Sequence, residues 1–314
     1  MPSLSFEGSK ESKPIAIVKG GSDDGKILYL HEDSGGKPPK PKTDFVRARY
    51  TKFLEGKKPS EKTRIFNEIH EALEKGLTEE HLPSTHRELF ERIRKDLSMD
   101  KTITLDDEGM FELLPSCKKD KREVWYVCGQ SGSGKSYIAK GLASNYHKLY
   151  PDRGVYLVSK LEKDDTLDAL KFLKRVNIQS FVDDYPSLEE FKDCFVIFDD
   201  YDTLTGPMGK VVAKIIDDLA IQGRHVNVTM ACLSHYLTNY KATRLILNEA
   251  THIVVYPLST SYHALKYLLK NYVGVEEEDL KRQRKMGSRW LMYSKGYPQY
   301  MVAQKNAELL HQTD

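Results

Sequence analysis

One string of residues constrains this chain more than any other feature. It is a complete GxxxxGK[ST] pattern made of Gly129, Gln130, Ser131, Gly132, Ser133, Gly134, Lys135 and Ser136. The apolar run VWYVC precedes it, and a stretch with Ile138, Leu142 and Tyr146 at helical spacing follows it. A strand that enters the glycine loop and a helix that leaves it are the context in which this pattern binds phosphate. The sequence therefore predicts a P-loop over these residues.

Each residue type in this loop has a physical role. Glycines let the backbone curl so that successive N–H groups point at phosphate oxygens, and the following helix adds the positive end of its dipole. We expect Lys135 to reach the β- and γ-phosphates and the Ser136 hydroxyl to bind Mg²⁺. Tyr137, the next residue, completes the predicted nucleotide-binding segment. The chain has no Asn-Lys-x-Asp sequence, which reads guanine, so ATP is the expected nucleotide.

A second acidic motif follows the apolar run FVIF, which ends in Asp199 and Asp200. An apolar strand that ends in acid places carboxylates at the carboxyl edge of a parallel sheet, beside the P-loop. We expect Asp199 to lie on the Mg²⁺ side, directly or through a water. Asp200 then fits the base that polarises the attacking water, with Asp202 as an alternative. Two adjacent acids favour a hydrolase over a kinase.

Polar residues around the next apolar run are candidates for the remaining catalytic roles. VNVTMACLS ends at Ser234 and is followed by His235, which can hold the attacking water or sense the γ-phosphate. Arg224 precedes this run and Arg244 follows it. A guanidinium at a subunit edge can neutralise charge that develops on a neighbour's γ-phosphate. The alternatives are a surface-loop histidine and solvated or ion-paired arginines.

The order of apolar runs predicts the fold. From Glu123 onward, strands alternate with helices, which indicates a mainly parallel sheet covered on both faces. RWLMYSKGYPQYMVA contains two strand-like runs around a Gly-Tyr-Pro turn and predicts a closing β-hairpin. We therefore predict an α/β fold: a P-loop NTPase domain of the additional-strand, catalytic-acid type over residues 121–314.

The first part of the chain predicts a smaller α+β region over residues 1–120, whose role the sequence does not indicate. PIAIVKGGSDDGKILYL reads as a β-hairpin, because two apolar runs flank a Gly/Asp turn. SGGKPPKPK has the composition of a basic linker. Apolar stripes at helical spacing follow up to about Leu97.

Composition excludes several classes of protein. Cys117, Cys128, Cys194 and Cys232 form no CxxC pair, so zinc and redox motifs of that kind are absent. The N-terminus has no apolar segment typical of a signal peptide, and no apolar run approaches the ~20 residues that span a bilayer. We expect an intracellular protein, or one packaged inside a particle, that is not secreted and has no membrane partner.

The formal net charge is only +2, so affinity for nucleic acid has to come from local clusters of basic residues. One cluster is Lys37, Lys40, Lys42, Arg47, Arg49 and Lys52. The others are Lys118, Lys119, Lys121 and Arg122, and Lys281, Arg282, Arg284 and Lys285. A solvated charged face is the alternative for each.

The motifs together carry a family resemblance. GQSGSGKS, FVIFDD, IQGRHVNVTMACLSH and ATRLILNEATHIVVYP occur in that order. In that order they resemble the FtsK–HerA superfamily of pumping ATPases, and most of all the genome-packaging ATPases of large double-stranded DNA viruses. The resemblance covers roughly residues 123 to 303. Two positions differ from its pattern: Asp200 stands where Glu is usual, and Ser234-His235 stands where Gln is usual.

The resemblance implies a pentameric or hexameric ring that hydrolyses ATP between subunits and passes double-stranded DNA through its channel. It implies that Lys135 and Ser136 bind phosphate and metal, that Asp199 and Asp200 form the acidic pair, and that Arg224 or Arg244 acts in trans. The setting would be host cytoplasm, a viral factory or the virion, with a capsid or portal protein as a further partner. A P-loop nucleotide or small-molecule kinase and an ATP-dependent assembly switch are the alternative functions.

Overall fold

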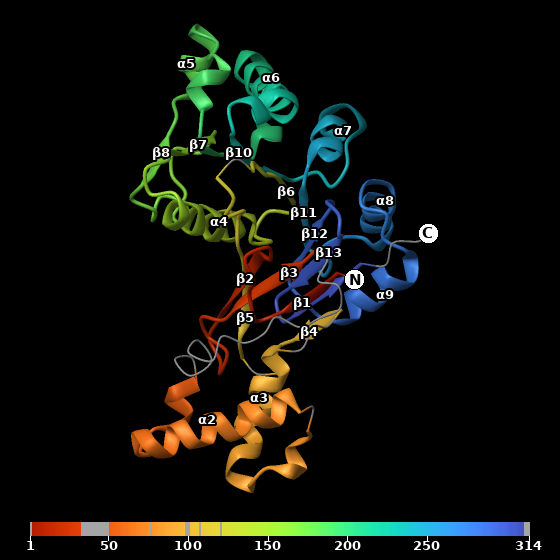
Figure 1. Ribbon diagram of the computed structural model, residues 1–314. Coiled ribbons are helices and arrows are strands. Elements are labelled where there is room, and N and C mark those ends of the chain that lie inside the picture. The colour runs from red at the N-terminus through yellow and green to blue at the C-terminus, as the bar shows by residue number, and fades with distance from the viewer. Residues whose placement is uncertain are drawn as a thin grey trace.

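The computed structural model describes residues 2–32, 50–75, 77–97, 101–106, 108–119 and 121–310. Figure 1 shows a large sheet with helices on both faces, a small sheet beneath it and a helix pair at the far end. The predicted linker, residues 34–42, lies outside the described residues. So do the members of the first basic cluster other than Lys52: Lys37, Lys40, Lys42, Arg47 and Arg49.

The strands of the large sheet follow the order β4-β14-β13-β12-β11-β6-β10-β9-β7-β8. Its parallel part consists of β11 (His252–Val255), β6 (Val124–Cys128), β10 (Thr229–Ser234), β9 (Phe195–Asp199), β7 (Val155–Ser159) and β8 (Leu173–Arg175). Because β10 lies between β6 and β9, an additional strand separates the loop-bearing strand from the acidic strand. This confirms the predicted fold class.

The remaining strands of this sheet are antiparallel and lie at one edge: β12 (Leu291–Ser294), β13 (Tyr300–Ala303), β14 (Asn306–Leu309) and β4 (Thr102–Thr104). β12 and β13 are the predicted closing hairpin. β14 extends it to a meander that the sequence did not predict, because Asn306-Ala-Glu-Leu309 has only a weak strand pattern.

Helices cover both faces of the parallel strands. α4 (Lys135–Leu149) lies on one face, whereas α6 (Gly206–Gln222), α7 (Tyr240–Glu249) and α8 (Tyr262–Tyr272) lie on the other. In β6, Trp125 and Val127 pack with α4, and the alternate residues pack with α6. Burial on both faces explains why this strand is an unbroken apolar run. The shorter helices are α5 (Ile178–Asp183) and α9 (Glu277–Lys285).

The small sheet packs on the α4 side of the molecule. It is antiparallel, with the order β1 (Ser3–Ser5), β3 (Ile27–His31), β2 (Lys13–Lys19) and β5 (Met110–Leu113), and contains the predicted β2–β3 hairpin. Phe111 and Leu113 share a buried cluster with Leu142 of α4. Residues on both sides of position 120 thus contribute to one core, and the predicted domain division there stays a prediction.

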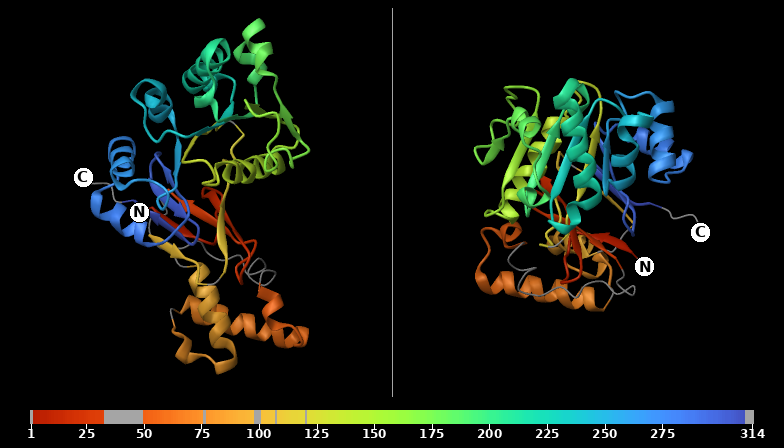
Figure 2. Two further views of the ribbon diagram at one scale, coloured as in Figure 1. Left: turned by 180° about the vertical axis from the view of Figure 1, so that it is seen from behind. Right: turned by 90° about the horizontal axis from the view of Figure 1, so that it is seen from above.

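α2 (Pro59–Glu74) and α3 (Ser84–Leu97) form a separate helix pair with its own buried cluster. Ile65, Ile69, Leu89, Phe90 and Ile93, from the two predicted stripes, are buried there. The short 3-10 helices η1 (Thr51–Leu54) and η2 (Glu79–His81) flank the pair. Figure 2 shows, from behind, that this pair and α6 lie at opposite ends of the molecule. No helix within the described residues is long and apolar enough to cross a membrane.

Candidate functional site

The P-loop connects the end of β6 to the start of α4, as the sequence predicts. Gly132 and Gly134 have φ values of 75° and 109°, in the left-handed region that favours glycine. A Cβ atom on Gly129 would lie 2.6 Å from the ring of Tyr256. The Gly129 N–H donates to the Ser234 carbonyl oxygen at 3.0 Å, which ties the start of the loop to the end of β10.

Lys135 points into the loop. Its side chain is only 7% exposed, and its Nζ donates to the carbonyl oxygens of Gly129 at 2.9 Å and Gln130 at 3.3 Å. The same Nζ lies 4.0 Å from Oδ1 of Asp200. The amine therefore lies at the mouth of the loop, between the place for phosphate and the predicted base.

Asp199 ends β9 and is buried, and Ser159 Oγ donates to its Oδ2 at 3.1 Å. Burial, followed by the nearby carboxylates of Asp200 and Asp164, raises the pKa of Asp199 to about 6. Ser136 Oγ donates to Asp164 Oδ2 at 3.3 Å. The predicted metal residues, Ser136 and Asp199, thus belong to a small acidic group that the sequence did not show in full, because Asp164 follows β7 outside any motif.

This donor set fits Mg²⁺, which binds one or two protein oxygens and otherwise keeps waters and substrate phosphates. Asp199 supports the fit, because its buried carboxylate lies near those of Asp200 and Asp164, a local concentration of negative charge that a cation would offset. Within the described residues no cluster of three or more His, Cys, Asp or Glu forms a complete metal cage. A magnesium ion here would depend on the nucleotide for its remaining ligands.

Asp200 and His235 face each other across the site. Asp200 has a φ of 47°, and its Oδ1 lies 2.9 Å from His235 Nε2. The other ring nitrogen of His235, Nδ1, lies 3.5 Å from Lys135 Nζ. The structure therefore brings together three residues that the sequence placed on separate motifs.

Asp202, the alternative base, has other partners. It lies in η4 (Tyr201–Thr203), and its Oδ2 accepts hydrogen bonds from Ser234 Oγ at 2.8 Å and from the His235 N–H at 2.7 Å. These contacts fix the end of β10 and so place the His235 ring. This geometry favours Asp200 over Asp202 as the group that faces the phosphate site.

The two candidate arginines lie away from the P-loop of their own chain. Arg224 is exposed in η5 (Gly223–His225), before the amino end of β10, whereas the P-loop follows the carboxyl end of the neighbouring parallel strand. Arg244 is exposed in the middle of α7, on the sheet face opposite α4. A role in trans for either one stays a prediction.

Arg289, in the segment before β12, is a residue of the site that the sequence analysis missed. Its Nε donates to the Ser133 carbonyl oxygen at 3.0 Å, and its Nη2 donates to that of Gly132 at 3.3 Å. The guanidinium therefore braces the P-loop from the antiparallel edge of the sheet. Nothing in the sequence SRW marked it, because the contact joins segments far apart in the chain.

The basic clusters differ in how many of their side chains already have partners within the chain. In α9, Arg282 pairs with Glu308 and Asp279, and Lys281 pairs with Glu277 at 3.1 Å. Arg122 donates to the carbonyl oxygens of Leu219 and Ala220 at 2.6 and 2.7 Å. Much of the charge predicted to contact DNA is thus already used within the chain.

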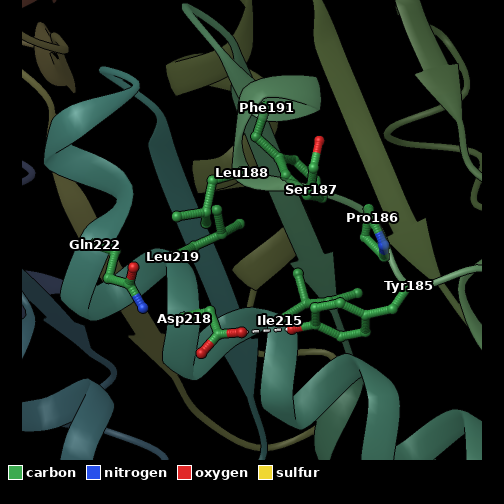
Figure 3. A pocket seen from close by; sticks show the side chains of 9 residues that line it. All are labelled: Tyr185, Pro186, Ser187, Leu188, Phe191, Ile215, Asp218, Leu219 and Gln222. Carbon is green, nitrogen blue, oxygen red and sulfur yellow. Dashed lines mark hydrogen bonds between the residues drawn. The ribbon is translucent and has the colours of Figure 1, made fainter.

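A second hollow lies away from the phosphate site (Figure 3). Residues 185–191, including η3 (Leu188–Phe191), and the second half of α6 enclose about 320 Å³. Tyr185 Oη donates to Asp218 Oδ2 at 2.6 Å across it. None of the predicted site residues lines this hollow.

Comparison with known proteins identifies a relative. No protein-family model matches the chain. The uncharacterized protein V3 of Sputnik virophage is 34% identical over 206 residues, which cover 65% of this chain and 82% of the virophage protein. The chain belongs to the family of this virophage protein. The match is long enough to include most of V3.

Solved structures with similar chains are more distant. The DNA-packaging ATPase B204 from Sulfolobus turreted icosahedral virus is 14% identical, with a TM-score of 0.41 over 60% of this chain and 98% of B204. The pCW3 conjugation coupling protein TcpA is 12% identical, with a TM-score of 0.42 over 93% of this chain and 77% of TcpA. The fold assignment rests on the strand order of the large sheet.

Proposed function

We propose that this chain is an ATP-hydrolysing motor that translocates double-stranded DNA and packages a viral genome into a capsid. The observation that carries the proposal is the convergence of Lys135, Asp200 and His235 at the mouth of the P-loop. A lysine for the phosphates and a carboxylate that can orient the attacking water are recurring parts of γ-phosphate hydrolysis, and the imidazole beside them can orient the carboxylate.

Nucleotide binding follows from the loop. The backbone N–H groups of residues 129–136 and the amino end of α4 present positive charge to the β- and γ-phosphates. Lys135 exchanges its contacts with the Gly129 and Gln130 carbonyl oxygens for phosphate oxygens. Ser136 and Asp199 would hold Mg²⁺, whose chemistry is to neutralise charge on the β- and γ-oxygens.

Hydrolysis requires a base that faces the γ-phosphate. Asp200 Oδ1 lies close enough to Lys135 Nζ, at 4.0 Å, for a water on the carboxylate to reach the phosphate that the amine binds. His235 fixes the orientation of this carboxylate from the other side, and Asp202 in turn fixes His235 through its backbone N–H. Asp200 therefore accepts the proton of the attacking water. His235, at the end of β10, acts as the sensor of the γ-phosphate.

The exposed arginines support a ring. Charge that develops on the γ-phosphate needs a guanidinium, and a finger of this kind contributes about 10³–10⁵ in rate. Arg289 braces the loop through its carbonyl oxygens, so its donors are directed at the protein rather than at the γ-phosphate. The exposure of Arg224 at the opposite edge of the sheet supports our assignment of this residue to the site of a neighbouring subunit.

Double-stranded DNA and a viral setting are supported by the motif resemblance and by the virophage relative. Lys118, Lys119 and Lys121 precede β6 and are the basic residues of the described chain that we assign to the DNA backbone. Contacts of this kind track phosphates without reading bases, as a translocating motor requires. The capsid or portal protein that receives the DNA, and the host cytoplasm, viral factory or virion as the place of action, belong to the same proposal.

The test is the rate of ATP hydrolysis by the purified protein with and without double-stranded DNA. We expect DNA to raise the rate, and rising salt to cancel the increase because phosphate contacts release counterions. A rate that ignores DNA but rises with a small-molecule phosphate acceptor would make the chain a kinase. Binding of ATP without turnover under any condition would indicate an assembly switch.

A further inference from the structure

A cavity of about 390 Å³ lies beside the P-loop, between α4 and the small N-terminal sheet. Tyr137 and Lys140 line it from α4, Met110 from β5, and Trp290 and Gln304 from the antiparallel edge of the large sheet. Its volume is within the usual range for small-molecule sites, roughly 300–1,000 Å³. The residues that line the cavity come from α4 and from β5 of the small sheet, among others, and Figure 1 shows α4 above this sheet.

The position of this cavity fits the path of a nucleotide. The P-loop and the amino end of α4 hold the β- and γ-phosphates, so the rest of the nucleotide leaves the loop past the first turn of α4. Tyr137 is in that turn, directly after Ser136, and Trp290 is adjacent to Arg289, which binds the loop. The cavity thus begins where the phosphate site ends.

The side chains at the mouth of the cavity suit a flat aromatic ligand. Tyr137 is 69% exposed and Met110 is 45% exposed, although both are large and apolar. Exposed apolar side chains that line the same hollow are typical of a binding site. An aromatic ring stacks on a base, and a thioether packs against ring edges.

Two hydrogen-bond networks hold the walls in place. Asn145 Nδ2 of α4 donates to Glu112 Oε1 at 2.8 Å and to the Leu113 carbonyl oxygen at 3.3 Å, which fixes β5 against the helix. Gln304 Oε1 accepts from the Arg289 N–H at 2.7 Å, and Gln304 Nε2 lies 3.4 Å from Met110 Sδ. Through Gln304 and Arg289, the cavity and the P-loop share one support.

We propose that this cavity binds the base and ribose of the nucleoside triphosphate, with the base stacked on Tyr137 and β5 forming the opposite wall. The inference rests on the proposed function, since it extends the site in which the P-loop binds ATP. It gives the N-terminal region a role, because Met110 and Glu112 come from a strand outside the P-loop sheet. Gln304, through its contacts with Arg289 and Met110, supports this wall.

The experiment compares two ligands on the full chain: a non-hydrolysable ATP analogue and inorganic tripolyphosphate, each with Mg²⁺. Only the first has a base. We expect Tyr137→Ala to lower the affinity for the ATP analogue by about 10-fold or more, the usual effect of losing one base–aromatic stack. The affinity for tripolyphosphate should be unchanged. Tyr137→Phe keeps the ring and should keep the affinity. Tyr267→Ala, an exposed tyrosine on α8, is the matched control.

A second measurement reports the cavity directly. Trp290 lines it, so the ATP analogue should change tryptophan fluorescence and tripolyphosphate should not, and Trp290→Phe should remove the change. If Tyr137→Ala binds the analogue as tightly as the wild type and the fluorescence is unaffected, the base binds elsewhere and the inference is wrong. Failure of the wild type to bind either ligand would instead overturn the proposed function.

Discussion

His235 Nε2 lies 2.9 Å from Asp200 Oδ1, a contact that joins the ends of two neighbouring parallel strands directly over the P-loop. β9 delivers the carboxylate and β10 delivers the imidazole. The backbone of Asp200 has a φ of 47°, a left-handed conformation in which Asp is much more common than most residues. This gives a physical reason for Asp at a position where the ATPases that the motifs resemble usually have Glu.

Replacing Asp200, the proposed base, should separate nucleotide binding from turnover. We expect Asp200→Asn to lower the rate of ATP hydrolysis by about 10²–10⁴-fold and to leave ATP bound, because the amide keeps the shape but cannot accept the water's proton. Bound nucleotide after gel filtration and phosphate release measure the two effects. Asp165→Asn, at an 87% exposed side chain, is the control. Full activity in Asp200→Asn would move the base to another group.

Lys135 is expected to be required for both nucleotide binding and hydrolysis. Lys135→Ala removes the amine that lies 2.9 Å from the Gly129 carbonyl oxygen and 4.0 Å from Asp200. We expect hydrolysis to fall by at least about 10²-fold, with the protein still folded by thermal denaturation. Lys192→Ala, an exposed lysine after η3, should have no effect. Wild-type turnover in the Lys135 variant would contradict the P-loop assignment.

The strands, loop and helix that the sequence predicted correctly share a local cause. An unbroken apolar run, a glycine loop and a helical stripe are adjacent in the chain, so the path from β6 to α4 could be read directly. The acidic ends of β9 and the polar end of β10 were also predictable, because parallel strands place their carboxyl ends at one edge. That edge now holds Lys135, Asp200 and His235 together.

What the sequence could not show depends on contacts between distant segments. Arg289 reaches the Ser133 carbonyl oxygen across 156 positions, and Asp164 reaches Ser136 across 28, with no motif at either place. The packing of β5 on α4 is of the same kind, since it depends on Asn145 meeting Glu112. Only tertiary structure brings such pairs together.

Asp199 predicts an unusual dependence of stability on pH. Burial and the Asp200 and Asp164 carboxylates raise its pKa from an ordinary 3.8 to about 6. The folded protein therefore binds this proton more tightly than the unfolded chain. The stabilisation is complete below the unfolded pKa and is lost as pH rises through about 6.

The variant Asp199→Asn tests the direction of this pH dependence of stability. The variant is neutral at every pH, so without nucleotide it should be more stable than the wild type at pH 7.5, by on the order of 3 kcal/mol. At pH 4.5 the difference should shrink, as thermal denaturation at both pH values would show. The same proton competes with Mg²⁺, so wild-type affinity for Mg²⁺-ATP should fall below pH 6. A variant less stable at pH 7.5 would show that the Ser159 hydrogen bond outweighs the buried charge.

Arg289 should affect nucleotide binding more than chemistry. Its two hydrogen bonds to the Ser133 and Gly132 carbonyl oxygens hold the loop open for phosphate. We expect Arg289→Ala to raise KM for ATP by about 10-fold, the usual effect of losing hydrogen bonds to a charged group, with a smaller change in kcat. Arg289→Lys should not restore KM, because an ammonium cannot donate in the same fork geometry. An unchanged KM with a reduced kcat would instead place the guanidinium on the γ-phosphate.

The ring hypothesis makes a prediction about mixtures of inactive proteins. Arg224 is exposed before the amino end of β10, away from the P-loop of its own chain, so the catalytic role that we propose for it is at a site on another subunit. Arg224→Ala alone should lower hydrolysis by about 10³-fold, while Arg64→Ala on α2 should not. When Arg224→Ala and Lys135→Ala proteins are mixed, some interfaces combine an intact P-loop from the first with an intact arginine from the second. We expect these interfaces to recover part of the wild-type rate, with a maximum near equal amounts. If no mixing ratio restores activity while the same experiment with Arg244→Ala does, the arginine that acts in trans is Arg244.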